Sequence, residues 1–189
     1  WRDERLKDLN LTAFVTSIDK CIEKKVDFIL ISGDLFNTSI PGIDKLKECV
    51  KCLRKLRRQQ IAVYIIAGSH DFSPSGKTML DVLEEAGLVK NVVSGEVVED
   101  KLKLKFTIDA KTGAKITGML GKKGMLEKSY YENLEVSNLE QEEGFKIFMF
   151  HTTLTEFKPE HLAMISSEPA AILPKGFDYY AGGHPHYIF

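Results

Sequence analysis

The stretch VYIIAGSHDF, from Val63 to Phe72, places an apolar run directly before Gly68, Ser69, His70 and Asp71. A buried strand normally ends in a turn made of Gly, Asn, Asp or Pro. An imidazole beside a carboxylate at such a strand tip therefore indicates a candidate site for chemistry. The segments on either side of this strand indicate the fold that presents the tip and the side chains that accompany it.

The first half of the chain alternates between helical and strand-like patterns. Apolar residues recur at spacings of three and four over 11–22 and over 43–56, which predicts two helices with one apolar face each. Short apolar runs follow at 27–32 and 61–68, and 77–87 is typical of a short helix closed by a glycine. This alternation predicts a mainly parallel, buried β-sheet.

The middle of the chain has a different pattern, in which apolar and polar residues alternate one by one. This holds over 92–100, 101–109 and 114–120, and DAKTGA between the last two is typical of a hairpin turn. We therefore expect an antiparallel section here. Residues 124–134 then have a helical pattern, and two later apolar runs predict the last strands.

Composition and charge narrow the class of protein. With 189 residues, 43% of them hydrophobic, the chain can form one core and is too short for two ordinary domains. A formal net charge of -1 provides no general attraction for a polyanion, so any nucleic-acid contact must be local. The longest apolar runs fall far below the roughly 18 residues of a membrane span, and the charged N-terminus is unlike a signal peptide. We expect a cytoplasmic protein with no membrane partner.

The three cysteines, Cys21, Cys49 and Cys52, lie in helix-patterned segments and cannot all pair within one chain. This arrangement fits a reducing compartment. Cys49 and Cys52 have the spacing of zinc ligands, but a zinc site needs a second such pair and the sequence has none. Reduced cysteines on a helix are the favoured interpretation.

Four apolar runs end in residue types that bind metal ions, and four of the five histidines lie there. Open α/β sheets bind ligands at the carboxyl ends of their strands. Each residue alone is more typical of a hydrogen-bonded structural group or a turn. Together they favour a metal site over chance placement. The residues are Asp34, then Ser69, His70 and Asp71, then His151, and finally His184 and His186.

A carboxylate among several imidazoles is a donor set for two divalent ions. Two ions about 3.5–4 Å apart can hold both the attacking and the leaving oxygen of a phosphoryl centre. Asp34 is the candidate bridge between them. His184 and His186 share one face if they lie in a strand, whereas a loop at Pro185 lets both rings converge, and either geometry provides two ligands.

The same segments resemble successive motifs of calcineurin-like metallophosphoesterases, in family order over nearly the whole chain. The stretch ISGDLFNTSIPG and the helix after it most resemble DNA-repair nucleases of the SbcD and meiotic recombination eleven type, particularly archaeal ones. The resemblance implies an α/β fold, a metallophosphoesterase-type sandwich of two mixed β-sheets flanked by helices. The motifs are GDLF at 33–36, GSHD at 68–71, the histidine after FMF at 151, and GHPH at 183–186.

The resemblance also implies roles for individual residues. Asp34 would bridge two manganese ions, and His186 would bind the first of them. The second ion would be bound by Ser69, His151 and His184. His70 would approach the scissile phosphate and stabilise the transition state or protonate the leaving oxygen, with its ring oriented by Asp71.

The sequence departs from the family pattern at two places. Ser69 stands where the family usually has Asn, and a neutral hydroxyl is a poorer ligand for a hard cation, so we expect weak or water-mediated binding. The family's first motif, an Asp-x-His pair after an N-terminal strand, is missing. We therefore expect residues 1–189 to be a single nuclease domain that is incomplete at both ends and lacks ligands at one of its two metal sites.

Two loop segments are candidates for substrate contact. Asn37 and the two hydroxyl residues after it follow the candidate bridging carboxylate, and neutral donors of this kind often bind a nucleic-acid backbone. Ser73, Ser75 and Lys77 form the second group. The basic stripe on the helix over 43–56 is instead interpreted as a solvated face, since it lies away from these loops.

The function predicted from these features is a metal-dependent DNA exonuclease or endonuclease of double-strand-break repair. The resemblance implies DNA, a second copy of the chain and an SMC-like ATPase as partners. A phosphodiesterase of small substrates and a catalytically impaired scaffold that binds DNA or protein stay open as alternatives. PSGKT is not a complete phosphate-binding loop because position 71 is Asp, and the adjacent side chains at 69–71 cannot form a hydrolytic triad.

Overall fold

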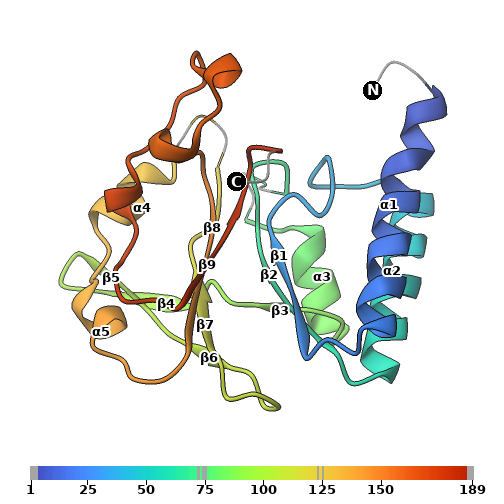
Figure 1. Ribbon diagram of the computed structural model, residues 1–189, viewed down its shortest axis with the longest axis horizontal. Helices are drawn as coiled ribbons and strands as arrows, with labels where there is room; N and C mark the ends of the chain where they lie inside the picture. Colours follow the sequence, from blue (N-terminus) through green and yellow to red (C-terminus); the bar gives the residue numbers. More distant parts are fainter. Residues whose placement is uncertain (1–3, 72, 74–75, 123, 125, 187–189) are drawn as a thin grey trace.

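The computed structural model describes residues 4–71, 73, 76–122, 124 and 126–186. Its strands form two larger sheets and one hairpin, and helices lie on the outer sides of both sheets (Figure 1). In chain order the elements are α1 (Glu4–Glu23), β1 (Phe28–Ser32), α2 (Ile43–Arg58), β2 (Ala62–Ile66), α3 (Met79–Glu85), β3 (Lys90–Asn91), β4 (Gly95–Val98), β5 (Lys101–Leu104), β6 (Thr107–Ile108), β7 (Lys115–Gly118), α4 (Lys128–Glu132), α5 (Ser137–Glu140), β8 (Lys146–His151), 3-10 helices at Thr155–Phe157, Glu160–Leu162 and Ala170–Ile172, and β9 (Tyr179–Gly183).

The first sheet has the strand order β1-β2-β3, and its described pairs are all parallel. α2 connects β1 to β2, and its buried residues recur at three and four positions: Cys49, Cys52, Leu53 and Leu56. α1 and α2 lie side by side over the outer face of this sheet (Figure 1). The predicted alternation of strand and helix is confirmed, because each helix needs the sheet to bury its apolar face.

The second sheet has the order β6-β7-β8-β9, with β6 antiparallel to β7 and the other pairs parallel. All six residues of β8 are buried, as expected for an inner strand covered on both faces. The two sheets pack face to face, and the apolar layer between them includes Tyr64, Ile66, Ile116 and Met149.

The outer face of the second sheet is covered by α4, α5 and the β4–β5 hairpin (Figure 1). Leu139, Phe148 and Phe177 belong to the apolar cluster on this side. The order of layers is therefore helix, sheet, sheet, helix. This confirms the predicted α/β sandwich, and the antiparallel section that the sequence indicated comprises the β4–β5 hairpin and the β6–β7 pair.

Local signals in the sequence set several element boundaries. α3 begins with a capping box in which Thr78 and Asp81 exchange hydrogen bonds, and Gly87 follows it with a left-handed φ of 64°. The turn between β6 and β7 begins at Asp109, whose buried carboxylate accepts a 2.7 Å hydrogen bond from the Tyr64 hydroxyl across the two sheets.

Two predictions about the class of protein, one on membrane spans and one on the cysteines, can be compared with the structure. No helix within the described ranges is long and apolar enough to cross a membrane. Cys21, Cys49 and Cys52 are free, as expected. Burial raises the pKa of Cys49 to about 12, so this thiol stays protonated near neutral pH.

Candidate metal centre

The ends of β1, β2, β8 and β9 meet at one edge of the sandwich (Figure 1). The Ser32 hydroxyl, at the end of β1, donates a 2.9 Å hydrogen bond to the carbonyl of Ala181 in the middle of β9. The two sheets thus direct the carboxyl ends of their strands to the same place. Side chains that follow these four strands are brought together although the chain separates them by up to about 150 positions.

Three of the predicted ligands converge there. His151 Nε2 lies 3.2 Å from Asp34 Oδ2 and 3.2 Å from His184 Nδ1. One ligand atom of each residue lies within 4.8 Å of those of the other two, which is a spacing that could hold a metal ion. We refer to Asp34, His151 and His184 as the metal cluster.

The hydrogen bonds of His151 define which ring nitrogen is available to the metal cluster. Its Nδ1 lies 2.7 Å from the carbonyl oxygen of Ser32. A carbonyl only accepts, so Nδ1 carries the hydrogen and Nε2 of the neutral ring presents a lone pair. That lone pair faces a carboxylate oxygen and a second imidazole nitrogen. Such a donor set fits a divalent cation, and the backbone carbonyl behind His151 orients the ring as metal-binding histidines require.

The electrostatics of the metal cluster favour a positive charge at its centre. Burial lowers the pKa of His151, but hydrogen bonds to Asp34 and to the Ser32 carbonyl outweigh burial and hold that pKa above its usual value. Burial raises the pKa of Asp34, yet hydrogen bonds from His151 and from the His70 backbone outweigh it, so the carboxyl is more acidic than usual. Burial and the nearby His151 lower the pKa of His184. The raised pKa of His151 favours a proton on Nε2, between the ring and Asp34. A metal ion would displace that proton, because an ionised carboxylate beside neutral imidazole is the protonation state that binds metal.

The backbone around the metal cluster is unusual. Gly33 has a φ of 87°, and a side chain there would collide with the His151 ring. Asp34 and His184 have φ values of 53° and 92°, in the left-handed region that residues with side chains rarely adopt. Strained residues of this kind concentrate at functional sites, where the surrounding structure holds them.

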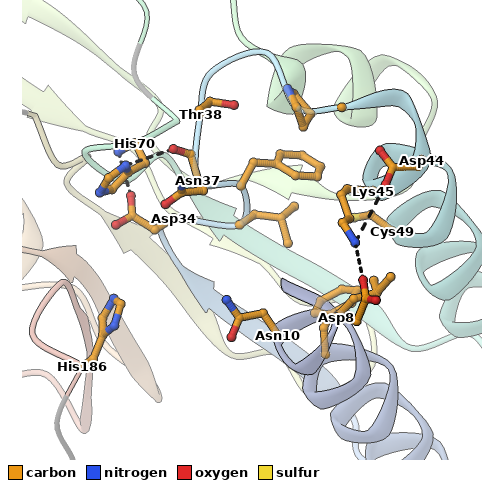
Figure 2. A pocket seen from close by; sticks show the side chains of 16 residues that line it. Asp8, Asn10, Asp34, Asn37, Thr38, Asp44, Lys45, Cys49, His70 and His186 are labelled. Carbon is orange, nitrogen blue, oxygen red and sulfur yellow. Dashed lines mark hydrogen bonds and ion pairs between the residues drawn. The ribbon is translucent and has the colours of Figure 1, made fainter. Parts of the chain in front are cut away.

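His70 lies on the exposed side of the same edge. Its backbone N–H donates to Asp34 Oδ1 at 2.8 Å, and its ring Nδ1 lies 3.1 Å from the backbone carbonyl oxygen of Asn37. A cavity of about 920 Å³ opens beside it, lined among others by Asp34, Asn37, His70 and His186. Figure 2 shows His70, Asp34 and Asn37 together at one end of this cavity. An extended substrate therefore has access to the carboxylate and the imidazole at once.

The described hydrogen bonds of Asp71 are with backbone groups and not with the His70 ring that it was expected to orient. Its carboxylate is 2% exposed and accepts hydrogen bonds from the backbone N–H groups of Gly68 at 3.0 Å and Phe36 at 3.2 Å. It joins the loop after β1 to the loop after β2, and the Asn37 carbonyl is the group that meets the His70 ring. Burial dominates over these bonds and raises the pKa of Asp71. Neighbouring side chains in a tight turn diverge, so Asp71 points into the interior while His70 points out.

Other predicted residues lie near the metal cluster without joining it. Ser69 is buried in the turn between Gly68 and His70. His186 is exposed and lines the same cavity, where Figure 2 shows it below Asp34 and apart from it. Their metal-binding roles stay predictions.

The residues predicted to contact the substrate do not all line the cavity. Asn37 and Thr38 line the cavity, as a substrate contact requires, whereas Ser73 and Lys77 lie on the loop after β2. Ser75 lies outside the described residues. The sequence interpretation assigned Asn37 a contact through its side chain and missed its backbone carbonyl, because no side-chain pattern reports where a main-chain oxygen points.

Comparison with known proteins identifies the class. The family model described as calcineurin-like phosphoesterase matches residues 8–187, so the chain belongs to that family. Members of this family are phosphoester hydrolases that use divalent metal ions, in agreement with the donor set of the metal cluster.

Similarity to individual proteins is more specific. The chain is 29% identical over 188 residues to the DNA double-strand break repair protein Mre11 of Methanococcus maripaludis, a match that covers 97% of this chain and 47% of that protein. It is also 29% identical over 181 residues to Mre11 of Archaeoglobus fulgidus, with 92% and 40% covered. The uncharacterized metallophosphoesterase YhaO of Bacillus subtilis is 27% identical over 182 residues, with 96% and 42% covered. The chain spans less than half the length of each of these relatives.

Proposed function

We propose that the chain forms the catalytic part of a manganese-dependent DNA nuclease of double-strand-break repair. The observation that carries this proposal is the convergence of the metal cluster beside an open cavity. Similarity to the Mre11 proteins over more than nine-tenths of this chain supports DNA as the substrate. In this proposal the protein works as a homodimer with an SMC-like ATPase.

The metal cluster would hold one ion, with Asp34 also in reach of a second. His186, which lines the same cavity, would serve that second ion, and Ser69 would add a weak ligand to the ion in the metal cluster. Divalent ions bound there would supply Lewis-acid stabilisation of the charge on the phosphate oxygens. The protein's own contribution is a fixed set of donors, which the strands orient before substrate arrives.

His70 is the proposed proton donor. Its Nδ1 faces the Asn37 carbonyl, which only accepts, so Nδ1 carries a hydrogen in either charge state of the ring. Nε2 is then the atom that gains or loses a proton. The backbone of His70 is held by Asp34, so the ring stays at a constant place relative to the metal cluster. A proton at Nε2 can pass to the leaving oxygen as the phosphodiester bond breaks.

DNA would lie along the cavity and over the loop after β2. Asn37 lies at the cavity wall, and Ser73 and Lys77 are the proposed contacts on the loop. Contacts to phosphate position a substrate without reading its sequence. Because the net charge of the chain is -1, binding would depend on these local groups and would weaken only modestly with salt.

The test is cleavage of duplex and single-stranded DNA, and of cyclic nucleotides, with and without manganese. It uses this chain and a version extended upstream, with His151→Ala as the control in each. We expect manganese-dependent cleavage of DNA in the extended version, lost in the control, and weaker cleavage by the 189-residue chain. Cleavage of cyclic nucleotides alone would favour the small-substrate phosphodiesterase. Manganese binding without any cleavage would favour the scaffold.

A further inference from the structure

The β4–β5 hairpin on the outer side of the second sheet has two edges that differ (Figure 1). Its turn residues, Glu99 and Asp100, have left-handed φ values of 50° and 59°, as a tight two-residue turn requires. The outer edge of β5 is hydrogen-bonded to residues 133–135. β4, in contrast, has no second strand beside it among the described residues. The outer edge of β4 is therefore the open edge of this hairpin.

The pairing of the hairpin fixes where the backbone groups of β4 point. In an antiparallel pair, two directly opposed residues turn their N–H and C=O groups either both toward the other strand or both away from it. Leu102 donates its N–H to the Asn133 carbonyl at 2.8 Å and accepts the Glu135 N–H at 2.9 Å, so both groups point away from β4. Val97 lies directly opposite Leu102. Val97 therefore directs its own N–H and C=O to the open edge.

Gly95 repeats this arrangement two positions earlier. It lies opposite Leu104, whose carbonyl accepts a 3.2 Å hydrogen bond from the Asn138 side chain beyond β5. No described residue forms a hydrogen bond with the outward groups of Gly95 or Val97. Both residues are exposed, Val97 to 71%. A row of accessible, unpaired backbone groups is a template for another strand.

A cavity of about 540 Å³ borders the same strand. Its walls include Val97 and Leu102 of the hairpin, Met119 and Leu120 after β7, and Tyr130 of α4. Directly opposed residues share one face of a hairpin, so the cavity lies on the face to which Val97 points. Every second side chain of a strand added beside β4 would point to that face. The cavity thus provides space for one large apolar side chain of the added strand.

The other face of the hairpin is charged. Glu96 lies opposite Lys103, and its Oε1 is 3.3 Å from Lys105 Nζ. Lys101 is on this face as well, and Glu135 lies near Lys101 and Lys103. Three lysines therefore meet two glutamates here, which leaves an excess of one positive charge. Acidic side chains on this face of an added strand are favoured over basic ones.

A second copy of β4 matches this place less well than a different segment does. The largest apolar side chains that β4 offers are those of Val97 and Val98, and a valine would leave most of the cavity empty. Its other side chain, Glu96, is already paired with Lys105. The cavity and the charges both favour a partner with a larger apolar residue.

We propose that the open edge of β4 binds an extended segment of another protein as an added strand, with a large apolar side chain in the cavity and acidic side chains beside the lysines. In this mode of recognition the main-chain hydrogen bonds supply affinity and the pocket supplies specificity. The surface is separate from the metal cluster, so the proposal does not depend on the proposed nuclease activity.

Short random peptides displayed on phage and selected on the immobilised chain are the probe. Val97→Pro removes an N–H that points away from β5, so the hydrogen bonds of the hairpin stay in place. Val97→Thr is the matched control, because it keeps that N–H and the preference for a strand. We expect the selected peptides to alternate apolar and acidic residues, to bind Val97→Pro about 10-fold more weakly or worse, and to bind Val97→Thr within about threefold.

The cavity has its own pair of variants. Ser129 lies on α4 and lines the cavity. Ser129→Phe fills the space, so we expect it to weaken peptide binding about 10-fold, whereas Ser129→Ala should leave it within about threefold. Manganese affinity should be the same in all four variants. Equal peptide binding by Ser129→Phe and Ser129→Ala would overturn the use of the cavity.

Amide hydrogen exchange in the unsubstituted chain keeps the test independent of how the variants fold. The N–H groups of Gly95 and Val97 should exchange rapidly in the free chain and slowly with peptide bound, whereas those of Glu96 and Val98 should be slow in both. A selection that yields no peptide, or peptides that leave Gly95 and Val97 unprotected, would overturn the proposal. Concentration-dependent dimerisation that Val97→Pro abolishes would make a second copy the occupant and would overturn it too.

Discussion

His151, at the end of β8, and His70, in the turn after β2, lie at the same site but differ in burial and in how their rings are held. His151 is 2% exposed, and both of its ring nitrogens are engaged, one by the Ser32 carbonyl and one by Asp34. His70 is exposed, and the described contact of its ring is with the Asn37 carbonyl. A buried, doubly held ring suits a ligand that must not move. An exposed ring held at one nitrogen suits a group that must exchange a proton with a substrate.

This contrast has a physical origin in the backbone. His151 is the last residue of an inner strand, where it pairs with Gly183 of β9 and where Gly121 leaves no space for a side chain against its ring. His70 lies in the turn after β2, which is held by the Asp71 carboxylate rather than by a strand ladder. The more rigid side of the site therefore carries the metal cluster, and the more exposed side carries the group next to the cavity. Four substitutions test this division, from the largest expected effect to the smallest, and the last of them also has an expected pH dependence.

His151→Ala should abolish manganese binding and DNA cleavage together. The change removes the ring that links Asp34 to His184, and it leaves a buried space at the end of β8. We expect manganese affinity to fall by more than about 100-fold, because loss of a direct ligand exceeds the effect of losing an outer partner. Calorimetry measures the binding. Retention of tight binding would remove His151 from the metal centre.

His70→Ala should separate cleavage from metal binding. The variant loses the proposed proton donor, so we expect the rate of DNA cleavage by the upstream-extended version to fall about 100- to 10,000-fold. Manganese affinity should stay within about threefold, because the His70 backbone and not its ring contacts Asp34. Single-turnover cleavage and calorimetry measure the two effects. A parallel loss of metal binding would place the ring among the ligands.

Asp71→Asn should weaken the protein without removing a ligand. One oxygen becomes an NH₂ group that faces the backbone N–H groups of Gly68 or Phe36, so at least one buried donor loses its acceptor. We expect the free energy of unfolding to fall by about 1–3 kcal/mol. Chemical denaturation in chelator measures it. Unchanged stability would contradict the role of Asp71 in joining the two loops.

Tyr64→Phe should have the smallest effect and should leave the site intact. It removes the 2.7 Å hydrogen bond to Asp109 between the two sheets, at an expected cost of about 1 kcal/mol in the free energy of unfolding. Manganese affinity should not change, since neither residue lies at the strand ends that form the metal cluster.

The contribution of the Tyr64–Asp109 hydrogen bond to stability should depend on pH, and the direction of that dependence follows from the pKa of Asp109. Burial raises the pKa of Asp109, but hydrogen bonds from Thr112 and Tyr64 outweigh burial and lower it overall. A carboxyl whose pKa is lower in the folded state stabilises above its unfolded pKa, and that contribution is lost as the pH falls through the folded value. The stability difference between the original chain and Tyr64→Phe should therefore shrink in acid. Denaturation curves at several acidic pH values measure this, and a constant difference would contradict it.

Much of the fold follows from local patterns. The helix over Ile43–Arg58 and the strand Ala62–Ile66 follow from apolar spacing, and the capping box at Thr78 follows from residue types at the right separation. The pairing of the strands into two sheets does not follow in the same way. Apolar runs specify burial but not neighbours, and β1 and β8 come from distant parts of the chain.

The sequence by itself determined which residue types follow each strand, and the rule that parallel strands present their ends at one edge was enough to group Asp34, His151 and His184 as candidates. Only the tertiary structure decided which partner each side chain meets. Asp71 turned out to hold two loops, and Asn37 meets the His70 ring through its backbone carbonyl. Side-chain direction in turns depends on backbone angles and on donors that fold in from elsewhere, and residue spacing carries no record of either.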